Sequence, residues 1–547
     1  MRLSPAALSL IAILVTTMAL AQPHRAKMRT LTDRPDRHVV IAKSDSDYIS
    51  FPDVCLTRGG RLICVYRVAD KHVATRARLE VRTSDDLGKT WSAPTVLSPD
   101  RGHCSRLTVL DDGEVLLIDD SAGPGGCTFR SKDEGRTWQG PFPTKLAHGI
   151  PDRPMRFGET SLITAGHRHI GAADNPWIGQ RPAHQVLYRS DDLGQTWREW
   201  APLATDPRLV LCEVSMLKMP DESIRAYLRE NAAVQEPTYV MESRDQGVTW
   251  SHPEDTPMIG HRPCAGLLRS GKALVTYRDV GPNGGNRAWL GDPDSERFFA
   301  PTAFDLGKGA TLTGDALVIE NEDGDADAVM YCLRPITDPL YASARLDVDL
   351  VVERNEGSHC TVRLGCAWRI FPDRVEPQVQ DIPAIPVDAT KPHRYSFSFE
   401  RGVAALSIDG EEKCRFDAFE HGVPRNRTVR PVRIGNDPAG LPLIGRFSFR
   451  GNAGRSVYRS ISLSIDEPHY RRYRWTWTPA DGLPNQYEAD RILELENDRL
   501  SPPGDFGYSG WVQLPDGRVF CAAHYRGGHG YSYISGTWIE EGDFGGE

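Results

Sequence analysis

An eight-residue phrase that occurs four times constrains the fold of this chain more than any other feature. Its frame is Ser-x-Asp-x-Gly-x-Thr-Trp, and the copies begin at Ser84, Ser131, Ser190 and Ser243. In a tight hairpin the Asp accepts hydrogen bonds from turn amides, and the Gly supplies a positive φ angle. The closing Trp offers a large apolar face to the sheet beneath it. We therefore interpret these octets as structural hairpins rather than as catalytic motifs.

The spacing of the octets predicts a repeat architecture. Successive copies lie 47, 59 and 53 residues apart, which is the range for one four-stranded propeller blade per repeat. Short apolar or alternating stretches such as 51–56, 61–66 and 77–82 precede the first octet, and similar stretches precede the others. Short strands with frequent turns are typical of an all-β fold.

The octets resemble the Asp-box, or BNR, repeat of the sialidase (neuraminidase) superfamily. That resemblance implies a six-bladed β-propeller, with blades 1–5 in residues 30–296 and the last blade in residues 469–547. We expect the N-terminal stretch 39–42 to pair with the last blade near 531–534, because this pairing closes the ring and removes its open edges.

Residues 297–468 contain no octet, and they predict a separate β domain inserted into the propeller. The stretches 345–352, 393–399 and 404–410 alternate or are apolar, and the last of them ends in Ile-Asp-Gly. This segment resembles a laminin-G or concanavalin-like jelly-roll sandwich. A glycan-binding role and a purely structural role both stay open for it.

The chain length, the net charge and the N-terminal residues limit the class of protein. A chain of 547 residues exceeds one compact core, and a net charge of −9 without a basic run argues against a nucleic-acid partner. Residues 1–21 combine Arg2, an apolar run and the small residues Ala19-Leu-Ala21, which is the pattern of a secretory signal peptide. A retained anchor is the alternative, although the run is short for a membrane span. We expect a secreted or periplasmic monomer with no membrane partner after cleavage.

Eleven cysteines and sixteen histidines raise the questions of disulfides and metals. Export permits disulfides, but their pairing cannot be read from sequence; Cys55 and Cys64 flank a turn and could face each other. No Cys/His spacing matches a zinc site. We therefore predict no metal and no cofactor, and we leave calcium open.

Two residues match the family's catalytic motifs. Sialidases use a Tyr nucleophile that a neighbouring Glu activates. A free phenol has a pKa near ~10 and is a poor nucleophile at neutral pH, so a carboxylate must take its proton as the new bond forms. Tyr508, between Gly507 and Ser509, matches the last-blade nucleophile motif, and Glu213 matches the motif of its partner. A Tyr that merely lines the channel is the alternative for Tyr508.

The family also holds the substrate carboxylate with three Arg, since a guanidinium binds a carboxylate at two points. Arg229 resembles the second of these and Arg287 the third. The usual first-blade phrase is aromatic-Arg-Ile-Pro, but here it reads Ile49-Ser-Phe-Pro52, with Ser50 at the Arg position. The Glu that supports that Arg in the family falls at about His524. The paired loss indicates a rebuilt site and places sialic acid itself in question.

The family's general acid is an Asp in the loop before the first octet, and Asp70 lies in that loop. Arg67, close by, could partly replace the missing Arg. His261 and Arg262 at the start of the fifth blade, and His524 in the sixth, are further candidates for contacting substrate. A His can also act as acid or base near neutral pH, although structural roles are open for each.

Three functions follow from these residues. The first is a secreted exo-glycoside hydrolase that removes a terminal acidic sugar, sialic acid or a relative, from glycans. The second is a lyase acting on uronic-acid polysaccharides, with His524 and Tyr508 moving the proton. The third is a non-catalytic glycan-binding propeller, for which the Tyr508 and Glu213 motifs would be unnecessary.

Overall fold

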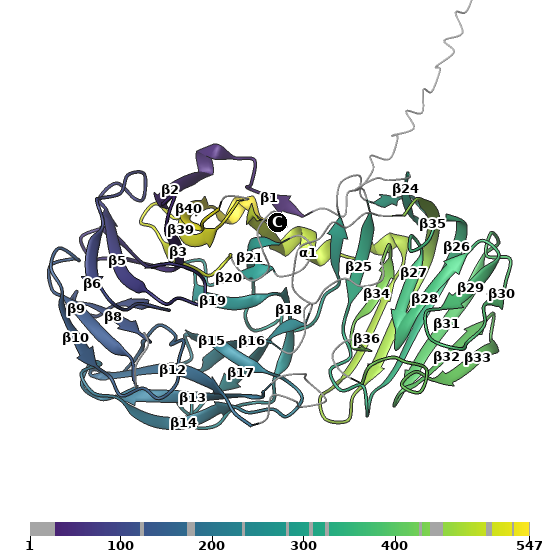
Figure 1. The fold of residues 1–547 in the computed structure, drawn as a ribbon, viewed down its shortest axis with the longest axis horizontal. Coiled ribbons are helices and arrows are strands. Elements are labelled where there is room, and N and C mark those ends of the chain that lie inside the picture. The colour runs from purple at the N-terminus through teal and green to yellow at the C-terminus, as the bar shows by residue number, and fades with distance from the viewer. Residues whose placement is uncertain are drawn as a thin grey trace, which may run out of the picture.

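The computed structural model describes residues 28–120, 125–171, 181–231, 236–279, 284–305, 310–322, 328–425, 429–437, 452–498, 506–527 and 530–545. The predicted signal peptide, residues 1–21, lies outside these ranges. Almost all of the regular secondary structure in the described chain is β-strand (Figure 1). Within it, no helix has both the length and the apolar character to cross a membrane.

Six sheets form the blades of a propeller (left in Figure 1). Blade 1 contains β3 (Tyr48–Leu56), β4 (Leu62–Ala69), β5 (Ala77–Ser84) and β6 (Thr95–Ser98). Blade 2 contains β7 (Arg106–Val109), β8 (Val115–Asp119), β9 (Cys127–Ser131) and β10 (Gln139–Pro143). Blade 3 contains β11 (Met155–Phe157), β12 (Ser161–His169), β13 (Ala183–Ser190) and β14 (Arg198–Ala204). Blade 4 contains β15 (Leu211–Lys218), β16 (Ile224–Glu230), β17 (Pro237–Ser243) and β18 (Glu254–Ile259).

The last two blades combine strands from distant parts of the chain. Blade 5 contains β19 (His261–Leu267), β20 (Ala273–Asp279), β21 (Gly285–Gly291) and β37 (Ile492–Asn497), with the short β1 (Arg29–Thr30) beside β37. Blade 6 contains β38 (Ser509–Gln513), β39 (Val519–Tyr525), β40 (Tyr533–Ile539) and β2 (His38–Ala42). Strand β2 pairs antiparallel with β40. The ring therefore closes through the N-terminal strand, as the sequence predicts.

A second β region interrupts blade 5 between its third and fourth strands (right in Figure 1). One sheet contains β22 (Thr302–Asp305), β25 (Val329–Leu333), β34 (Val432–Gly435), β27 (Thr361–Leu364), β28 (Cys366–Phe371), β29 (Arg374–Pro377) and β30 (Ile385–Pro386). The other contains β23 (Ala310–Leu312), β24 (Leu317–Asn321), β35 (Gly454–Asp466), β26 (Ser343–Asn355), β31 (His393–Glu400), β32 (Val403–Ile408), β33 (Glu411–Asp417) and, paired with β35, β36 (Arg472–Trp477). Strand β36 extends this region past the boundary expected at residue 468.

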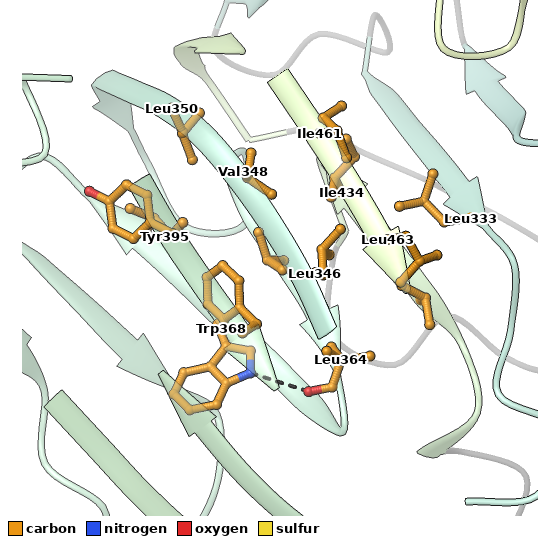
Figure 2. Close-up of a cluster of buried hydrophobic side chains, with 14 of the residues drawn as sticks. Leu333, Leu346, Val348, Leu350, Leu364, Trp368, Tyr395, Ile434, Ile461 and Leu463 are labelled. Atoms are coloured by element: carbon orange, nitrogen blue, oxygen red, sulfur yellow. Dashed lines mark hydrogen bonds between the residues drawn. The ribbon is translucent and has the colours of Figure 1, made fainter. Parts of the chain in front are cut away.

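The two sheets of this region share one hydrophobic core (Figure 2). Trp368 and Ile434 come from the first sheet, while Leu346, Tyr395 and Ile461 come from the second. The likeness to laminin-G or concanavalin-like domains stays a prediction. After β36 the chain returns to blade 5 through the short helix α1 (Gln486–Arg491). Within the described ranges the chain also forms the short 3₁₀ segments η1 (Pro35–Arg37), η3 (Pro479–Asp481) and η4 (Glu541–Asp543).

Each octet forms the hairpin between the third and fourth strands of blades 1–4. In the first octet, Asp86 accepts hydrogen bonds from the Thr90 amide at 2.9 Å and from the Thr90 hydroxyl at 2.6 Å. The Ser84 hydroxyl accepts the Gly88 amide at 2.9 Å, and the Trp91 indole donates to the Gly88 carbonyl at 3.0 Å. The Ser and Asp bonds recur in the other three octets.

The octets also connect neighbouring blades. Gly88 in blade 1 lies so close to the Phe520 ring of blade 6 that an added Cβ would be 2.6 Å from it. The octet glycines of blades 2, 3 and 4 approach Ile63, Leu116 and Leu187, each in the preceding blade. Hydrophobic clusters lie at all six blade interfaces. The positive-φ glycine thus serves both the turn and the packing between blades.

All eleven cysteines are free thiols. Cys55 packs between blades 1 and 2, whereas Cys64 packs between blades 6 and 1. The two therefore lie on opposite faces of blade 1 and do not face each other across the turn.

The Gly88 contact predicts a specific loss of stability. Gly88 (φ 95°) and Gly517 (φ 99°) both have left-handed backbones, but an added Cβ at Gly517 would meet nothing within 4 Å. Gly517→Ala should cost about 1–2 kcal/mol from backbone strain. Gly88→Ala should cost about 1–3 kcal/mol more, since the methyl group overpacks against a buried ring. Urea unfolding measures both; equal losses would contradict the interblade contact.

Candidate active site

A β-bulge recurs at the same place in the first strands of three blades. In blade 1, Ser50 pairs with Arg67 and Asp53 with Val65, so β3 has one more residue than β4 between these pairs. Strands β15 and β19 show the same shift after Cys212 and His261. The residue that follows has a positive φ in each case: 55° at Phe51, 44° at Glu213 and 53° at Arg262.

The fourth example is in blade 3. Ile150 has φ 54°, and it follows Gly149, which forms a bridge with His167. The Asp152 amide then bonds to the Ala165 carbonyl, so the chain again has one extra residue. A bulge turns a side chain away from the ordinary alternation of a strand. Left-handed backbone at residues other than Gly is strained and is often found at functional sites.

The bulges define two sets of side chains at one end of the ring. The first set consists of the bulge residues Phe51, Ile150, Glu213 and Arg262. The second set consists of the residues that pair, on the adjacent strand, with the residue before each bulge: Arg67, His167, Arg229 and Arg278. First strands of different blades contact one another, as β3 does with β38 and β15 with β19. Residues scattered along the sequence therefore meet, and they meet around Tyr508.

Tyr508 and Glu213, from blades 6 and 4, form a direct hydrogen bond. The Tyr508 hydroxyl donates to Glu213 Oε1 at 2.6 Å. Arg229 Nη1 donates to Glu213 Oε2 at 2.6 Å and to the Tyr508 oxygen at 3.2 Å. All three residues are more than nine-tenths buried. The structure thus places the two residues of the predicted catalytic pair, and one predicted arginine, in a single cluster.

The charges in this cluster suit a base that activates a phenol. Burial opposes ionisation of Glu213, but Arg229 and Arg262 outweigh it and hold the pKa of the carboxyl well below its usual range. Burial, reinforced by the Glu213 charge, raises the pKa of Tyr508. A neutral phenol therefore donates to an ionised carboxylate, and Glu213 is ready to accept the proton when the oxygen attacks.

Two further guanidinium groups lie over the Tyr508 ring. Arg262 is 5.4 Å and Arg278 5.0 Å from its centroid. Arg278 Nη2 also contacts His261 Nδ1 at 3.2 Å. Arg262 is 2% exposed, yet its Nε and Nη1 have no hydrogen-bond partner among the residues that the structure describes. Because a buried unpaired polar group is costly, these donors indicate a site that receives an anionic group.

On the blade 1 side, Phe51 contacts Tyr508. Their ring centroids lie 4.9 Å apart, and His524 lies edge-on to both rings at 5.4 and 6.0 Å. Arg67 stacks 4.4 Å from the Phe51 ring and donates to the Ser50 hydroxyl at 3.1 Å. Arg67 thus lies beside Ser50, the position at which the family pattern has its first arginine.

Two of the buried histidines in the cluster, His261 and His167, have lowered pKa values. Burial, with Arg229 and Arg278 nearby, lowers the pKa of His261 well below its usual value. His167, which the sequence did not single out, accepts the Glu213 amide at 3.4 Å, and burial lowers its pKa to about 4. His261 therefore contacts Arg278 as a neutral ring, and we do not assign it an acid role.

Two predicted site residues have other partners. Arg287 in β21 forms ion pairs with Asp279 at 2.6 Å and with Glu488 of α1 at 3.1 Å, so both ends of its guanidinium are occupied. Arg278 is the arginine that lies over Tyr508 instead. Its sequence signal is its place: like Arg229, it is the penultimate residue of the second strand of its blade, followed by an acidic residue.

The Asp70 carboxylate forms its hydrogen bonds within its own loop. Its exposed carboxylate accepts the Thr75 hydroxyl and the amides of Thr75 and Arg76, the latter two at 2.9 and 3.1 Å. These bonds, the Thr75 hydroxyl first, lower the pKa of Asp70. A general acid must hold its proton near neutral pH. The expected acid role for Asp70 therefore does not fit its surroundings.

Comparisons with known proteins found one family model and several solved structures that are similar to parts of this chain. Residues 112–288 match the model of the BNR repeat-like domain family. No curated protein sequence matches the chain. A protein of unknown function from Dyadobacter fermentans is 21% identical over 55% of this chain and 94% of its own, with a TM-score of 0.41. A Trypanosoma rangeli sialidase is 10% identical over 80% and 96%, with a TM-score of 0.33. A xylan β-1,4-xylosidase from Bacillus halodurans is 12% identical over 78% and 89%, with a TM-score of 0.35.

The BNR repeat-like match over residues 112–288, the four octets and the six blade sheets together show a β-propeller that contains BNR repeats.

The unpaired donors of Arg262 predict an unusual effect on stability. Arg262→Met removes a buried guanidinium whose Nε and Nη1 have no partner in the described residues, but it also removes a cation that favours ionised Glu213. Because these effects oppose each other, we expect the free energy of unfolding without ligand to change by no more than about 1 kcal/mol. Arg334→Met is the matched control, because Arg334 is equally buried but pairs with Asp255 and Glu467, both at 2.6 Å. It should lose about 3–5 kcal/mol. Equal losses of unfolding free energy for the two variants, measured by urea unfolding, would contradict the unpaired donors of Arg262.

Proposed function

We propose that the protein is an exported exo-glycoside hydrolase that removes a terminal acidic sugar, sialic acid or a relative, from glycans. The observation that carries the proposal is the 2.6 Å hydrogen bond between the Tyr508 hydroxyl and Glu213 inside a group of buried arginines. A glycan-binding protein has no need of a phenol paired with an ionised base. The signal-peptide pattern at residues 1–21 supports export.

Tyr508 acts as the nucleophile in this proposal. As its oxygen approaches the anomeric carbon, its proton passes along the existing hydrogen bond to Glu213. A carboxylate nucleophile would be repelled by a substrate that carries its own carboxylate, whereas a phenol that is neutral until attack is not. The covalent sugar–tyrosine intermediate is then hydrolysed, so the anomeric configuration is retained.

The arginines bind the sugar carboxylate. Arg262 offers Nε and Nη1, which have no partner in the described part of the chain, and Arg278 lies on the same ring of Tyr508. Arg229 bridges Glu213 and Tyr508, so it positions the pair and contributes positive charge. Arg67 beside Ser50 adds a fourth cation on the blade 1 side. Guanidinium groups are suited to carboxylates because they donate at two points.

The first test is the release of free sugar from sialosides and from uronate-bearing glycans. The unaltered protein should hydrolyse one class, and Tyr508→Phe should lower kcat by about 10³-fold or more, since the nucleophile is removed. Tyr525→Phe, a buried tyrosine in the same blade, should keep its activity. An unsaturated product that absorbs in the ultraviolet would show a lyase instead, and binding without turnover would show a glycan-binding protein.

The charges around Glu213 predict how activity depends on pH. Catalysis needs ionised Glu213, so activity falls as the pH drops through its pKa, which Arg229 and Arg262 depress below the ordinary 4.5. Removing a cation raises this pKa, and Arg262→Gln should therefore move the acid limb of kcat/KM to higher pH. Arg244→Gln, exposed in the fourth octet, should leave the limb in place. An unmoved limb in Arg262→Gln would exclude Glu213 as the base.

A further inference from the structure

We propose that His103, oriented by Asp120, is the general acid that protonates the oxygen of the departing group. This inference rests on the proposed function and supplies the role that Asp70 cannot fill. No residue of this pair belongs to the octets or to the motifs of Tyr508 and Glu213.

His103 lies at the edge of the Tyr508 cluster. The next residue, Cys104, packs with Phe51 and Tyr508 in one buried group. The His103 ring meets the Phe51 ring edge-on, with centroids 5.3 Å apart, and the same Phe51 ring lies 4.9 Å from Tyr508. The side chain of His103 is 35% exposed, whereas Tyr508 is only 8% exposed. The nucleophile is therefore deeply buried, whereas the His103 side chain is partly exposed to solvent at the edge of the same cluster.

Asp120 fixes the orientation of His103. His103 Nδ1 lies 3.0 and 3.1 Å from the two carboxylate oxygens. Those oxygens also accept the amides of Cys104 at 2.9 Å and of Ile150 at 2.5 Å. Asp120 thus joins His103 to the bulge of blade 3. A carboxylate on Nδ1 holds the proton on that nitrogen and leaves Nε2, which lies 4.0 Å from Cys104 Sγ, as the nitrogen that can exchange a proton.

The surroundings of His103 favour its protonated form. Cys104 and the Asp120 carboxylate raise the pKa of His103 above its usual value, with burial acting against them. Asp120 itself is held ionised, because His103 and two backbone amides outweigh the effect of burial on its pKa. His103 therefore holds a proton at neutral pH, which a general acid requires, whereas Asp70 does not.

The protons balance over the two steps. When the glycosidic bond breaks, the Tyr508 oxygen bonds to the anomeric carbon and Glu213 takes the phenol proton. His103 Nε2 gives its proton to the departing oxygen. In the second step, water gives a proton to neutral His103 and its oxygen bonds to the anomeric carbon. The bond to Tyr508 then breaks, and the phenolate recovers its proton from Glu213.

A metal site is the rival interpretation of the same residues. Ligand atoms of His103, Cys104 and Asp120 all lie within 4.8 Å of one another. However, the Asp120 carboxylate already accepts hydrogen bonds from two backbone amides besides its contact with His103 Nδ1. The distance from Cys104 Sγ to His103 Nε2 is 4.0 Å. Because the Asp120 carboxylate is occupied by these hydrogen bonds and orients the His103 ring, we favour a proton-transfer role over a metal site.

The test compares two leaving groups on one sugar. The probes are the 4-methylumbelliferyl and methyl α-glycosides of N-acetylneuraminic acid and the corresponding glucuronides. A methyl glycoside needs an acid to leave, whereas 4-methylumbelliferone leaves without much help. His103→Gln should lower kcat/KM for the methyl glycoside by about 10²–10⁴-fold and for the aryl glycoside by less than about tenfold. Asp120→Asn should also lower kcat/KM for the methyl glycoside more than for the aryl glycoside, by a smaller factor than His103→Gln. Asp70→Asn should have the same kcat/KM as the unaltered protein for both substrates.

Each outcome decides the matter. Equal losses on both leaving groups would mean that His103 is structural and would overturn the inference, while loss of turnover in Tyr508→Phe would still support the hydrolase. Turnover that a chelator abolishes and added Zn²⁺ restores would overturn it in favour of a metal site. If the unaltered protein cleaves neither sugar, the proposed function and this inference fall together.

Discussion

The β-bulge in the first strands of the blades is the constraint on which the candidate site depends. In a regular strand, side chains alternate between the two faces, and both faces of each blade are packed against neighbouring blades. The extra residue, in left-handed conformation, turns one side chain out of that packing. Phe51, Glu213 and Arg262 reach Tyr508 in this way. Each strained residue costs about 1–2 kcal/mol, which the hydrophobic interfaces of the blades offset.

Burial and charge act against each other at Glu213, and their balance determines its chemistry. Burial alone would protonate this carboxyl, but Arg229 and Arg262 reverse the outcome. The same arginines are themselves hard to bury, and Arg262 keeps two donors without partners in the described residues. The cluster is therefore arranged for an anionic group rather than for stability alone, as is common where local rules are broken at functional sites.

The sequence predicted the ring well, because the octet uses hydrogen bonds within eight residues and needs no tertiary context. Tyr508 and Glu213 were identified through short motifs around them. Arg278 was missed in favour of Arg287, because the choice depends on strand register and on partners from α1 that are distant in sequence. The loop of Asp70 offered a local signal that was overlooked: its bond to Thr75 resembles that of Asp86 to Thr90. His103 acquires its partner Asp120 only through the pairing of β7 and β8.

The insertion in blade 5 and the pairing of β2 with β40 also determine when the ring can form during synthesis. Strand β21 has an open edge until the whole second region has been made and β37 emerges, and such edges invite pairing with other chains. Because synthesis adds about 5–20 residues per second, this edge stays unpaired for at least several seconds while the second region is made. It can pair sooner after β37 emerges if the second region folds on its own and brings its two ends together. Strand β2 waits longer still, for the last strand of the ring. Tyr508 and Glu213 can therefore meet in the closed ring only after the strands of blade 6 have been made.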